Sequence, residues 1–241
     1  MSRYFIELAY KGTNYHGWQT QPNAVTVQET IENALSKKLQ EDVKITGAGR
    51  TDTGVHAEFF VAHFDTSKSI TEKTVYGLNR MLPNDISVFK IYEVNKDKHT
   101  RFDAISRTYE YRISTTKNPF YNETTAFIPT SFDIELLNKA SKILLDYTDF
   151  TSFSKLHTDV KTNNCNITEA FWREENGFII FRITADRFLR NMVRAIVGTL
   201  LELNTGKIKI KEFEEIIEAK NRNKAGKSAN AEGLFLFEIK F

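Results

Sequence analysis

Strand-like and helix-like segments follow one another through the first hundred residues in the order β, α, β, β, α, β. The apolar residues of the two helical segments recur every three or four positions, whereas the strand segments are short, apolar and bounded by turn residues. This order is typical of the split βαβ, or ferredoxin-like, arrangement, in which two helices cover one face of an antiparallel sheet. The expected elements are the strands 4–10, 43–48, 59–64 and 86–94 and the helices 26–39 and 75–82.

The second half of the chain repeats this layout loosely. Asn176-Gly177 lies between two apolar segments, and Asn-Gly in that position is the strongest short-range signal for a β-hairpin. We therefore predict an α+β fold of two ferredoxin-like halves, 1–104 and 105–241, whose antiparallel sheets meet at a central active-site cleft. The expected elements of the second half are the strands 108–115 and 234–241, the helices 133–145 and 187–203, and a hairpin that pairs 170–174 with 178–183.

The composition predicts a soluble protein of a reducing compartment. With 241 residues and 41% hydrophobic content, the chain can build a substantial core, and no run approaches the roughly 18 apolar residues of a membrane helix. The first residues lack the apolar segment of a secretion signal, and the single Cys165 has no second cysteine with which to form a disulfide. We expect a cytoplasmic protein that does not associate with a membrane.

Several classes of chemistry have no motif in this chain. There is no Gly-x-x-x-x-Gly-Lys-Ser/Thr phosphate loop and no Gly-x-Ser-x-Gly hydrolase elbow. A metal site is not expected, because the histidines are scattered without ligand spacing and have no cysteine or carboxylate cluster beside them. The five histidines are His16, His56, His63, His99 and His157.

One carboxylate lies between glycine-bearing turns in the string from Gly47 to Ala57, which reads Gly-Ala-Gly-Arg-Thr-Asp-Thr-Gly-Val-His-Ala. Glycines let the backbone adopt positive φ values and approach another molecule closely, while the predicted strands on both sides give the loop a rigid support. Asp52 is therefore a candidate to meet a ligand, beside the cation of Arg50. The structural alternative is a tight turn in which Asp52 hydrogen-bonds its own backbone.

Two basic clusters stand out in a chain whose net charge is only +2. If 187–203 is a helix at roughly 100° per residue, the three arginines at positions 187, 190 and 194 fall within an arc of roughly 60° away from the apolar face. Guanidinium groups suit phosphate because their planar fork makes bidentate hydrogen bonds. A solvated basic face is the alternative for each cluster. The second cluster consists of Lys220, Arg222, Lys224 and Lys227.

A strand pattern at 106–113 alternates strictly, which places Tyr109 and Tyr111 on the same strand face. Tyrosines in such a strand are commonly core residues. An exposed tyrosine ring can instead stack on a nucleobase. The pair Arg101-Phe102 just upstream adds a short basic and aromatic pattern of the kind found in nucleic-acid grooves.

These strings resemble the tRNA pseudouridine synthase A family, and they do so over essentially the whole chain. Gly49–Ala57 resembles the family's catalytic loop, Arg107–Tyr111 its substrate-tyrosine strand, and Met192–Gly198 one of its helices. Further matches in the right order are Tyr15–Gln19 followed by Val27-Gln28, then Asp149–Phe153, and finally Ala231–Leu236.

The resemblance implies isomerisation of uridine to pseudouridine at positions 38 to 40 of the tRNA anticodon stem-loop, without a cofactor or an obligatory metal. It implies that Asp52 is the nucleophile and that Tyr109 stacks on the flipped uracil. It further implies that Arg50 and Arg194 are active-site cations and that the enzyme is a homodimer. From the basic clusters we expect additional RNA contacts by Arg187, Arg190, Arg222 and Lys224.

Two other functions stay open at this point. The first is a catalytically silent RNA-binding module on the same fold, which would need a basic groove but none of Asp52, Arg50 and Tyr109. The second is a hydrolase of nucleosides or nucleotides. It is disfavoured because metal ligands are missing and because the loop around Asp52 contains no second carboxylate before Glu58 on the departing strand.

Overall fold

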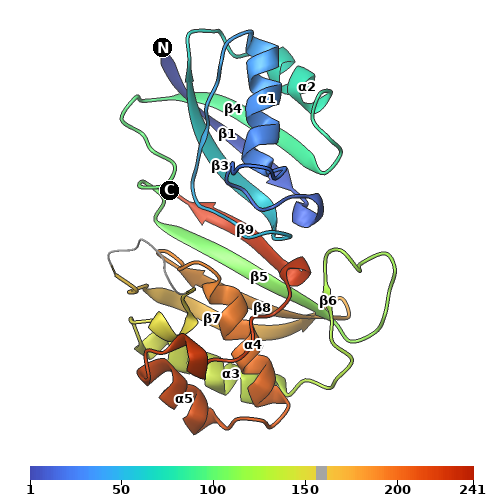
Figure 1. The fold of residues 1–241 in the computed structure, drawn as a ribbon, viewed down its shortest axis with the longest axis vertical. Helices are drawn as coiled ribbons and strands as arrows, with labels where there is room; N and C mark the ends of the chain where they lie inside the picture. The colour runs from blue at the N-terminus through green and yellow to red at the C-terminus, as the bar shows by residue number, and fades with distance from the viewer. Residues whose placement is uncertain (156–161) are drawn as a thin grey trace. The chain divides into compact units, whose positions relative to one another are not determined.

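The computed structural model describes residues 1–155 and 162–241, and the chain divides into two compact units (Figure 1). The first unit consists of Met1–Ile105 and Phe235–Phe241, and the second of Ser106–Leu234. Both units contain helices packed on strands, so the fold is α+β as predicted. The segment Phe235–Phe241, which the sequence pattern assigned to the second half, belongs to the first unit.

The first unit is a mainly antiparallel sheet with two helices on one face (Figure 1). Its strands are β1 (Ser2–Tyr10), β2 (Thr46–Gly47), β3 (His56–Thr66), β4 (Ile86–Val94) and β9 (Leu234–Lys240), and its helices are α1 (Val27–Leu39) and α2 (Glu72–Asn79). The strand order is β4-β1-β3, and β2 pairs with β3. β9 pairs in parallel with the start of β3, where His56 lies opposite Phe235.

Both helices of the first unit are confirmed, and local signals set their ends. α1 begins after Thr26, whose hydroxyl accepts a hydrogen bond from the Glu29 backbone N–H. It ends where Gln40 adopts a left-handed conformation with a φ of 55°. α2 spans Glu72–Asn79 instead of the predicted 75–82, so it ends before Pro83, the residue that was expected to stop it.

The predicted strand 43–48 is shorter than expected, because the backbone N–H groups of Val43 and Ile45 bond to side chains of α1. The Ile45 N–H donates to the Glu32 carboxylate (3.0 Å), and the Val43 N–H donates to the Ser36 hydroxyl (2.9 Å). Side chains of the helix thus replace a neighbouring strand as hydrogen-bond partners. Only the last residues of the segment enter the sheet, as β2.

The second unit is also a sheet covered by helices (Figure 1). Its strands are β5 (Ser106–Ser114), β6 (Ala126–Phe127), β7 (Ile167–Glu175) and β8 (Phe178–Ala185), and its helices are α3 (Ile134–Ile143), α4 (Met192–Asn204) and α5 (Ile210–Glu218). The antiparallel strands have the order β5-β8-β7, and β6 pairs in parallel with β5. The predicted hairpin is confirmed, since Asn176 and Gly177 join β7 to β8 with φ values of 52° and 79°. Helix α5 was not predicted.

The prediction of a helix that starts at Arg187 is wrong, because α4 starts only at Met192. Asn191 adopts a left-handed conformation with a φ of 65°, which interrupts any helix that includes it. Before it, the Asp186 carboxylate accepts a hydrogen bond from the Arg187 N–H (2.7 Å) and fixes a turn. Arg187 and Arg190 therefore precede the helix and do not share a helical stripe with Arg194.

Each unit has its own aromatic core. In the first, Trp18 stacks on Phe60 with ring centroids 4.0 Å apart, and in the second, Trp172 packs on Phe181 at 4.9 Å. All four rings are at most 2% exposed, and burying an aromatic ring of this size contributes roughly 1.5–3 kcal/mol. In the described part of the chain, no helix is both long enough and apolar enough to cross a lipid bilayer.

Candidate active site

The loop that carries Asp52 connects β2 to β3 and is held by backbone hydrogen bonds at both ends. The Ala48 N–H donates to the Val61 carbonyl (2.9 Å), which extends the ladder between the two strands. Toward β3, the Val55 N–H donates to the Asp52 carbonyl (3.1 Å). Gly54, with a φ of 77°, allows this turn because a side chain would strain it. The loop therefore has the rigid strand support that its sequence predicts.

The segment after β1 packs so closely on this loop that only glycine fits at two positions. The Trp18 N–H donates to the Thr51 carbonyl (3.2 Å). A Cβ atom at Gly12 would lie 2.0 Å from the Val55 carbonyl oxygen, and one at Gly17 would lie 2.4 Å from the Thr51 carbonyl oxygen. A side chain at either glycine would push the two segments apart, so both glycines serve to fix the loop.

Two buried hydrogen bonds add to this support. The Tyr10 hydroxyl lies 2.9 Å from the Thr51 hydroxyl, and the Gly12 N–H donates to Nδ1 of His56 (3.0 Å). The His56 ring is 1% exposed and stacks on Phe235 at 4.6 Å. His56 is thus a buried acceptor that ties the loop to β9, a role that its sequence position did not reveal.

Asp52 is half-buried on this fixed loop, and Arg50 is exposed. A Cβ atom at Gly49 would meet no atom beyond its chain neighbours within 4 Å, so the loop is not packed against other segments at this position. A carboxylate that is partly exposed on a preorganised backbone can reach a bound molecule without a costly rearrangement.

In the second unit, Tyr109 and Tyr111 of β5 share a face but have different surroundings. Tyr111 is fully buried, packs against Gly233 and has its pKa raised above the usual range, chiefly by burial. It is a core residue. Tyr109 is half-buried, and its ring meets the Phe188 ring edge-on at 5.1 Å with an interplanar angle of 86°. Of the two tyrosines, Tyr109 is therefore the one whose ring is partly accessible for stacking.

Arg194 lies in the first turn of α4 and is half-buried. Its Nε donates to the Ala229 carbonyl (2.7 Å), and the Ala229 N–H donates back to the Arg194 carbonyl (2.9 Å). The same loop passes so close to the helix that a Cβ atom at Gly198 would lie 1.8 Å from the Lys227 carbonyl oxygen. The orientation of Arg194 is thus set by the loop packed along α4.

The second basic cluster divides into a structural arginine and exposed lysines. The Arg222 guanidinium donates to the carbonyls of Ala225 (3.3 Å) and Gly226 (3.1 Å) and to the Ser228 hydroxyl (2.9 Å). These bonds stabilise the loop that packs on α4. Lys224 is exposed. The spacing of charges in the sequence did not distinguish these two roles.

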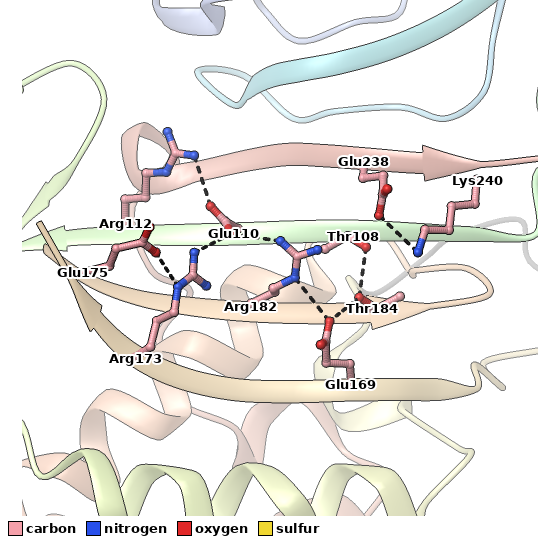
Figure 2. Close-up of polar contacts among 10 residues, drawn as sticks. All are labelled: Thr108, Glu110, Arg112, Glu169, Arg173, Glu175, Arg182, Thr184, Glu238 and Lys240. Atoms are coloured by element: carbon pink, nitrogen blue, oxygen red, sulfur yellow. Dashed lines mark hydrogen bonds and ion pairs between the residues drawn. The ribbon is translucent and has the colours of Figure 1, made fainter.

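The sequence pattern also missed a carboxylate surrounded by arginines on the sheet of the second unit. Figure 2 shows three guanidinium groups directed at Glu110, which is 2% exposed. Arg173 donates at 2.9 Å, and Arg112 and Arg182 each donate at 3.1 Å. Burial alone would raise the pKa of Glu110, but the hydrogen bonds from Arg173 and Arg112 outweigh burial and hold the pKa below its usual value.

The signal for this cluster is distributed over three strands. Glu110 and Arg112 are alternate residues of β5, while the other two arginines come from β7 and β8. Glu169 and Glu175 bind the outer sides of Arg182 and Arg173 (3.2 and 2.6 Å). The three arginines and three glutamates balance in charge, so the cluster is a stabilising network of the sheet.

Among the described residues, no group of three or more His, Cys, Asp and Glu side chains is placed to hold a metal ion. His157, one of the scattered histidines, lies outside the described residues.

Comparison with known proteins identifies the family. The profile of the family described as tRNA pseudouridine synthase matches residues 8–103 and 140–241. The tRNA pseudouridine synthase A of Parabacteroides distasonis is 54% identical, over 100% of this chain and 96% of its own length. The enzyme of the same name from Bacteroides thetaiotaomicron is 53% identical, over 100% of this chain and 91% of its own length. The one from Bacillus pumilus is 40% identical, over 96% of this chain and 96% of its own length. The chain therefore belongs to the tRNA pseudouridine synthase family and is an isomerase that modifies tRNA.

Proposed function

We propose that this enzyme isomerises uridine to pseudouridine at positions 38 to 40 of the tRNA anticodon stem-loop, with Asp52 as the nucleophile. One observation carries the assignment of Asp52: this carboxylate is partly exposed on a loop that is locked between two strands and the segment after β1. The relatives named tRNA pseudouridine synthase A support the reaction.

Three other side chains complete the proposed site. Tyr109 stacks on the flipped uracil, since its ring is half-buried and held edge-on by Phe188. Arg50 and Arg194 act as cations toward the substrate or toward Asp52.

The reaction explains why one carboxylate suffices. The bond between N1 of uracil and C1′ of the ribose breaks, the base turns within the site, and C5 bonds to C1′ in its place. The proton on C5 then leaves to restore the aromatic base. Asp52 can activate the sugar or the base by covalent attack, or it can take the 2′ proton. The target base must first leave its stack, at a cost of a few kcal/mol that contacts elsewhere on the tRNA offset.

The proposals for compartment, oligomeric state, cofactor and domain layout follow from the resemblance to the family. We propose a cytoplasmic homodimer that needs no cofactor. The strand order β4-β1-β3, with β2 on β3, supports a ferredoxin-like layout for the first unit, and we propose a similar layout for the second unit and an active-site cleft where the two sheets meet.

Loss of tritium from C5 of uridine tests the proposed nucleophile. Wild-type enzyme should release tritium from a tRNA transcript labelled at that carbon, because the C5 proton leaves during the reaction. Asp52→Asn should reduce release by about 1000-fold or more, since an amide is not a nucleophile, and it should bind tRNA as tightly as the wild type. As a control, Asp42→Asn, whose side chain is 80% exposed in the same unit, should release tritium normally.

The remaining outcomes separate the rival functions. Binding of tRNA by the wild type without release would indicate a silent RNA-binding module, and free uracil among the products would indicate a hydrolase. Transcripts in which cytidine replaces uridine at positions 38, 39 and 40 locate the modified sites. Release from a transcript with all three replacements would exclude the anticodon assignment.

Tyr109→Phe separates stacking from hydroxyl chemistry. The ring is preserved, so tRNA affinity should change little, whereas any proton transfer by the phenol would be lost. A reduced rate of tritium release at unchanged affinity supports a role for the hydroxyl in proton removal. A wild-type rate would show that the ring acts by stacking alone.

The proposed phosphate contacts are tested by salt dependence. For wild-type enzyme, the logarithm of tRNA affinity should fall linearly with the logarithm of salt concentration. Each of Arg187→Ala, Arg190→Ala and Lys224→Ala should reduce that slope by about 1 if the residue binds a phosphate. Lys211→Ala, an 85% exposed lysine of α5, serves as the control. Arg222→Ala should in addition lower stability, because its guanidinium holds its own loop.

A further inference from the structure

An aromatic ring stands exposed on the turn that follows β4. Phe102 is 76% exposed, whereas most large apolar side chains among the described residues are buried. The ring lies on His99 with centroids 4.3 Å apart and planes 34° apart. The guanidinium carbon of Arg101 is 6.0 Å from the Phe102 centroid. An exposed ring supported by a second ring is a surface on which a planar group can stack.

The turn itself is rigid. The N–H groups of Phe102 and Asp103 both donate to the His99 carbonyl (3.1 and 2.9 Å), and the Arg101 N–H donates to Nδ1 of His99 (3.1 Å). The His99 N–H donates to the Asp103 carboxylate (3.0 Å). Because backbone and ring are already ordered, a molecule that stacks on Phe102 does not have to order the turn first.

This turn is anchored to both strands that flank the Asp52 loop. The His99 ring meets the His63 ring edge-on at 4.6 Å, and Nδ1 of His63 lies 2.8 Å from the Thr100 hydroxyl. That hydroxyl donates to the Thr46 carbonyl (3.0 Å). Thr46 of β2 and His63 of β3 are paired neighbours in the ladder that carries the loop. The Phe102 ring is therefore connected to the strands of the candidate catalytic loop through a short chain of contacts, of which Thr100 and His63 are buried.

The charges around the ring suit a polyanion. Arg101 is exposed beside the ring, and the side chain of Lys98 is 53% exposed. The negative charge of Asp103 in the same turn is partly compensated. Its carboxylate accepts a hydrogen bond from the His99 backbone N–H and lies 3.7 Å from the Lys98 ammonium. An apolar ring flanked by cations matches a nucleobase and its phosphodiester better than it matches an apolar peptide.

We propose that Phe102 is a stacking platform for a base of the bound tRNA other than the isomerised uracil, and that Arg101 binds an adjacent phosphate. The platform rests on the tRNA-modifying function but not on the position of the modified base. Base stacking on an aromatic side chain, together with a guanidinium beside it, is a common way to hold single-stranded or splayed RNA. The rigid link to β2 and β3 then positions the RNA relative to the Asp52 loop.

Phe102→Trp provides a direct probe of stacking. The two native tryptophans, Trp18 and Trp172, are 2% exposed, so the new indole supplies the solvent-exposed part of the fluorescence. Unmodified tRNA should quench this emission at the concentrations at which it binds, as measured separately by filter binding. Unchanged emission from a variant that is saturated with tRNA would overturn the proposal.

Phe102→Ala measures the contribution of the platform. We expect tRNA affinity to weaken by about 5- to 150-fold, with the rate of tritium release at saturating tRNA within about 2-fold of the wild type. Phe102→Trp should restore the affinity, and Arg101→Ala should lower the salt slope of binding by about 1. Phe89→Ala removes another exposed phenylalanine, 54% exposed on β4 of the same unit, and should leave affinity unchanged.

Two results would overturn the platform. The first is wild-type tRNA affinity in Phe102→Ala. The second is a change in the oligomeric mass of that variant at unchanged affinity per site, which would identify the ring as a protein interface. Tritium release by the wild type reports on the proposed reaction independently, so failure of the platform and failure of the reaction give different results.

Discussion

At the scale of single residues, Glu110 shows how a buried charge is stabilised by its neighbours. Its carboxylate is 2% exposed and receives hydrogen bonds from three arginines of three strands. Removing one partner of such a cluster leaves like charges close together without compensation. The arginines are themselves 21–30% exposed, so water relieves part of this penalty.

Glu110→Gln should therefore lower the free energy of unfolding by about 2–4 kcal/mol, as measured by urea denaturation at pH 7. Glu175→Gln is the matched control, because its side chain is 48% exposed and binds one arginine; it should cost less than about 1 kcal/mol. Since folding lowers the pKa of Glu110, its contribution is fully present above pH 4.5 and is lost as the pH falls below that value. Equal effects of the two substitutions would contradict this account.

Stability should also depend on pH through His63, whose pKa is shifted mainly by burial and not by an ion pair. Burial, together with the electrostatic effects of the neighbouring His99 and Arg3, lowers the pKa of His63 to about 4, from 6.5 in the unfolded chain. Between these values the unfolded state binds the additional proton, so stability falls as the pH is lowered from 6.5. We expect a loss of about 2 kcal/mol between pH 7.5 and 5 from this residue. Urea denaturation of wild type and His63→Gln at both pH values isolates it, since the variant should lack this part of the pH dependence.

At the scale of elements, substitution of two helical glycines by alanine should have opposite effects on stability, because the two glycines have different surroundings. At Gly198 of α4, a Cβ atom would lie 1.8 Å from a backbone oxygen of the packed loop, which cannot move without breaking its bonds to the helix. At Gly77 of α2, it would meet the end of the flexible Lys38 side chain at 2.5 Å. Gly198→Ala should lower stability by about 2 kcal/mol or more, whereas Gly77→Ala should be neutral or raise it by up to about 1 kcal/mol. Thermal unfolding of both variants measures the difference.

The same scale shows which elements a sequence can predict. The hairpin at Asn176-Gly177 and the start of α1 after Thr26 depend on neighbouring residues alone, and both were predicted. The start of α4 was wrong because Asn191 takes a left-handed conformation that helical periodicity does not register. The strand before the loop was too long because Glu32, from another element, takes its hydrogen bonds. Side-chain competition across elements is not encoded in local spacing.

The candidate site likewise has features that the sequence predicts and features that it does not. Two glycines of the Asp52 loop meet the expectation from the sequence: Gly54 has a positive φ of 77°, and a Cβ atom at Gly47 would lie 2.6 Å from the Trp18 side chain. Gly49 shows neither feature, since its φ is not positive and a Cβ atom there would meet no other atom within 4 Å. The Glu110 cluster was missed because it exists only when β5, β7 and β8 adopt their register. The separate roles of Arg222 and Lys224 likewise depend on how one loop packs on a helix, which their spacing does not specify.

At the scale of the whole molecule, the chain has 33 basic and 31 acidic residues, so its overall charge does not attract RNA strongly. Local placement decides instead which cations face the solvent. The other feature at this scale is the path of the chain, whose final strand returns to the first unit. β9 pairs with β3 at the end of the Asp52 loop, and its Phe235 stacks on His56.

Deletion of residues 235–241 tests this dependence of the loop on the C-terminal strand. Phe235, Leu236 and Ile239 are 2–6% exposed, and each contributes roughly 1.5–3 kcal/mol by burial. The burial free energy lost with these three side chains is comparable to the total stability of a domain. Strand β3 should therefore lose its protection from hydrogen exchange, while β7 and β8 stay protected. The truncated enzyme should also no longer release tritium. Deletion of Phe241 alone, which is 44% exposed, should leave both properties intact. Full protection of β3 in the longer deletion would show that the loop is held without β9, by the segment after β1 and the β2–β3 ladder alone.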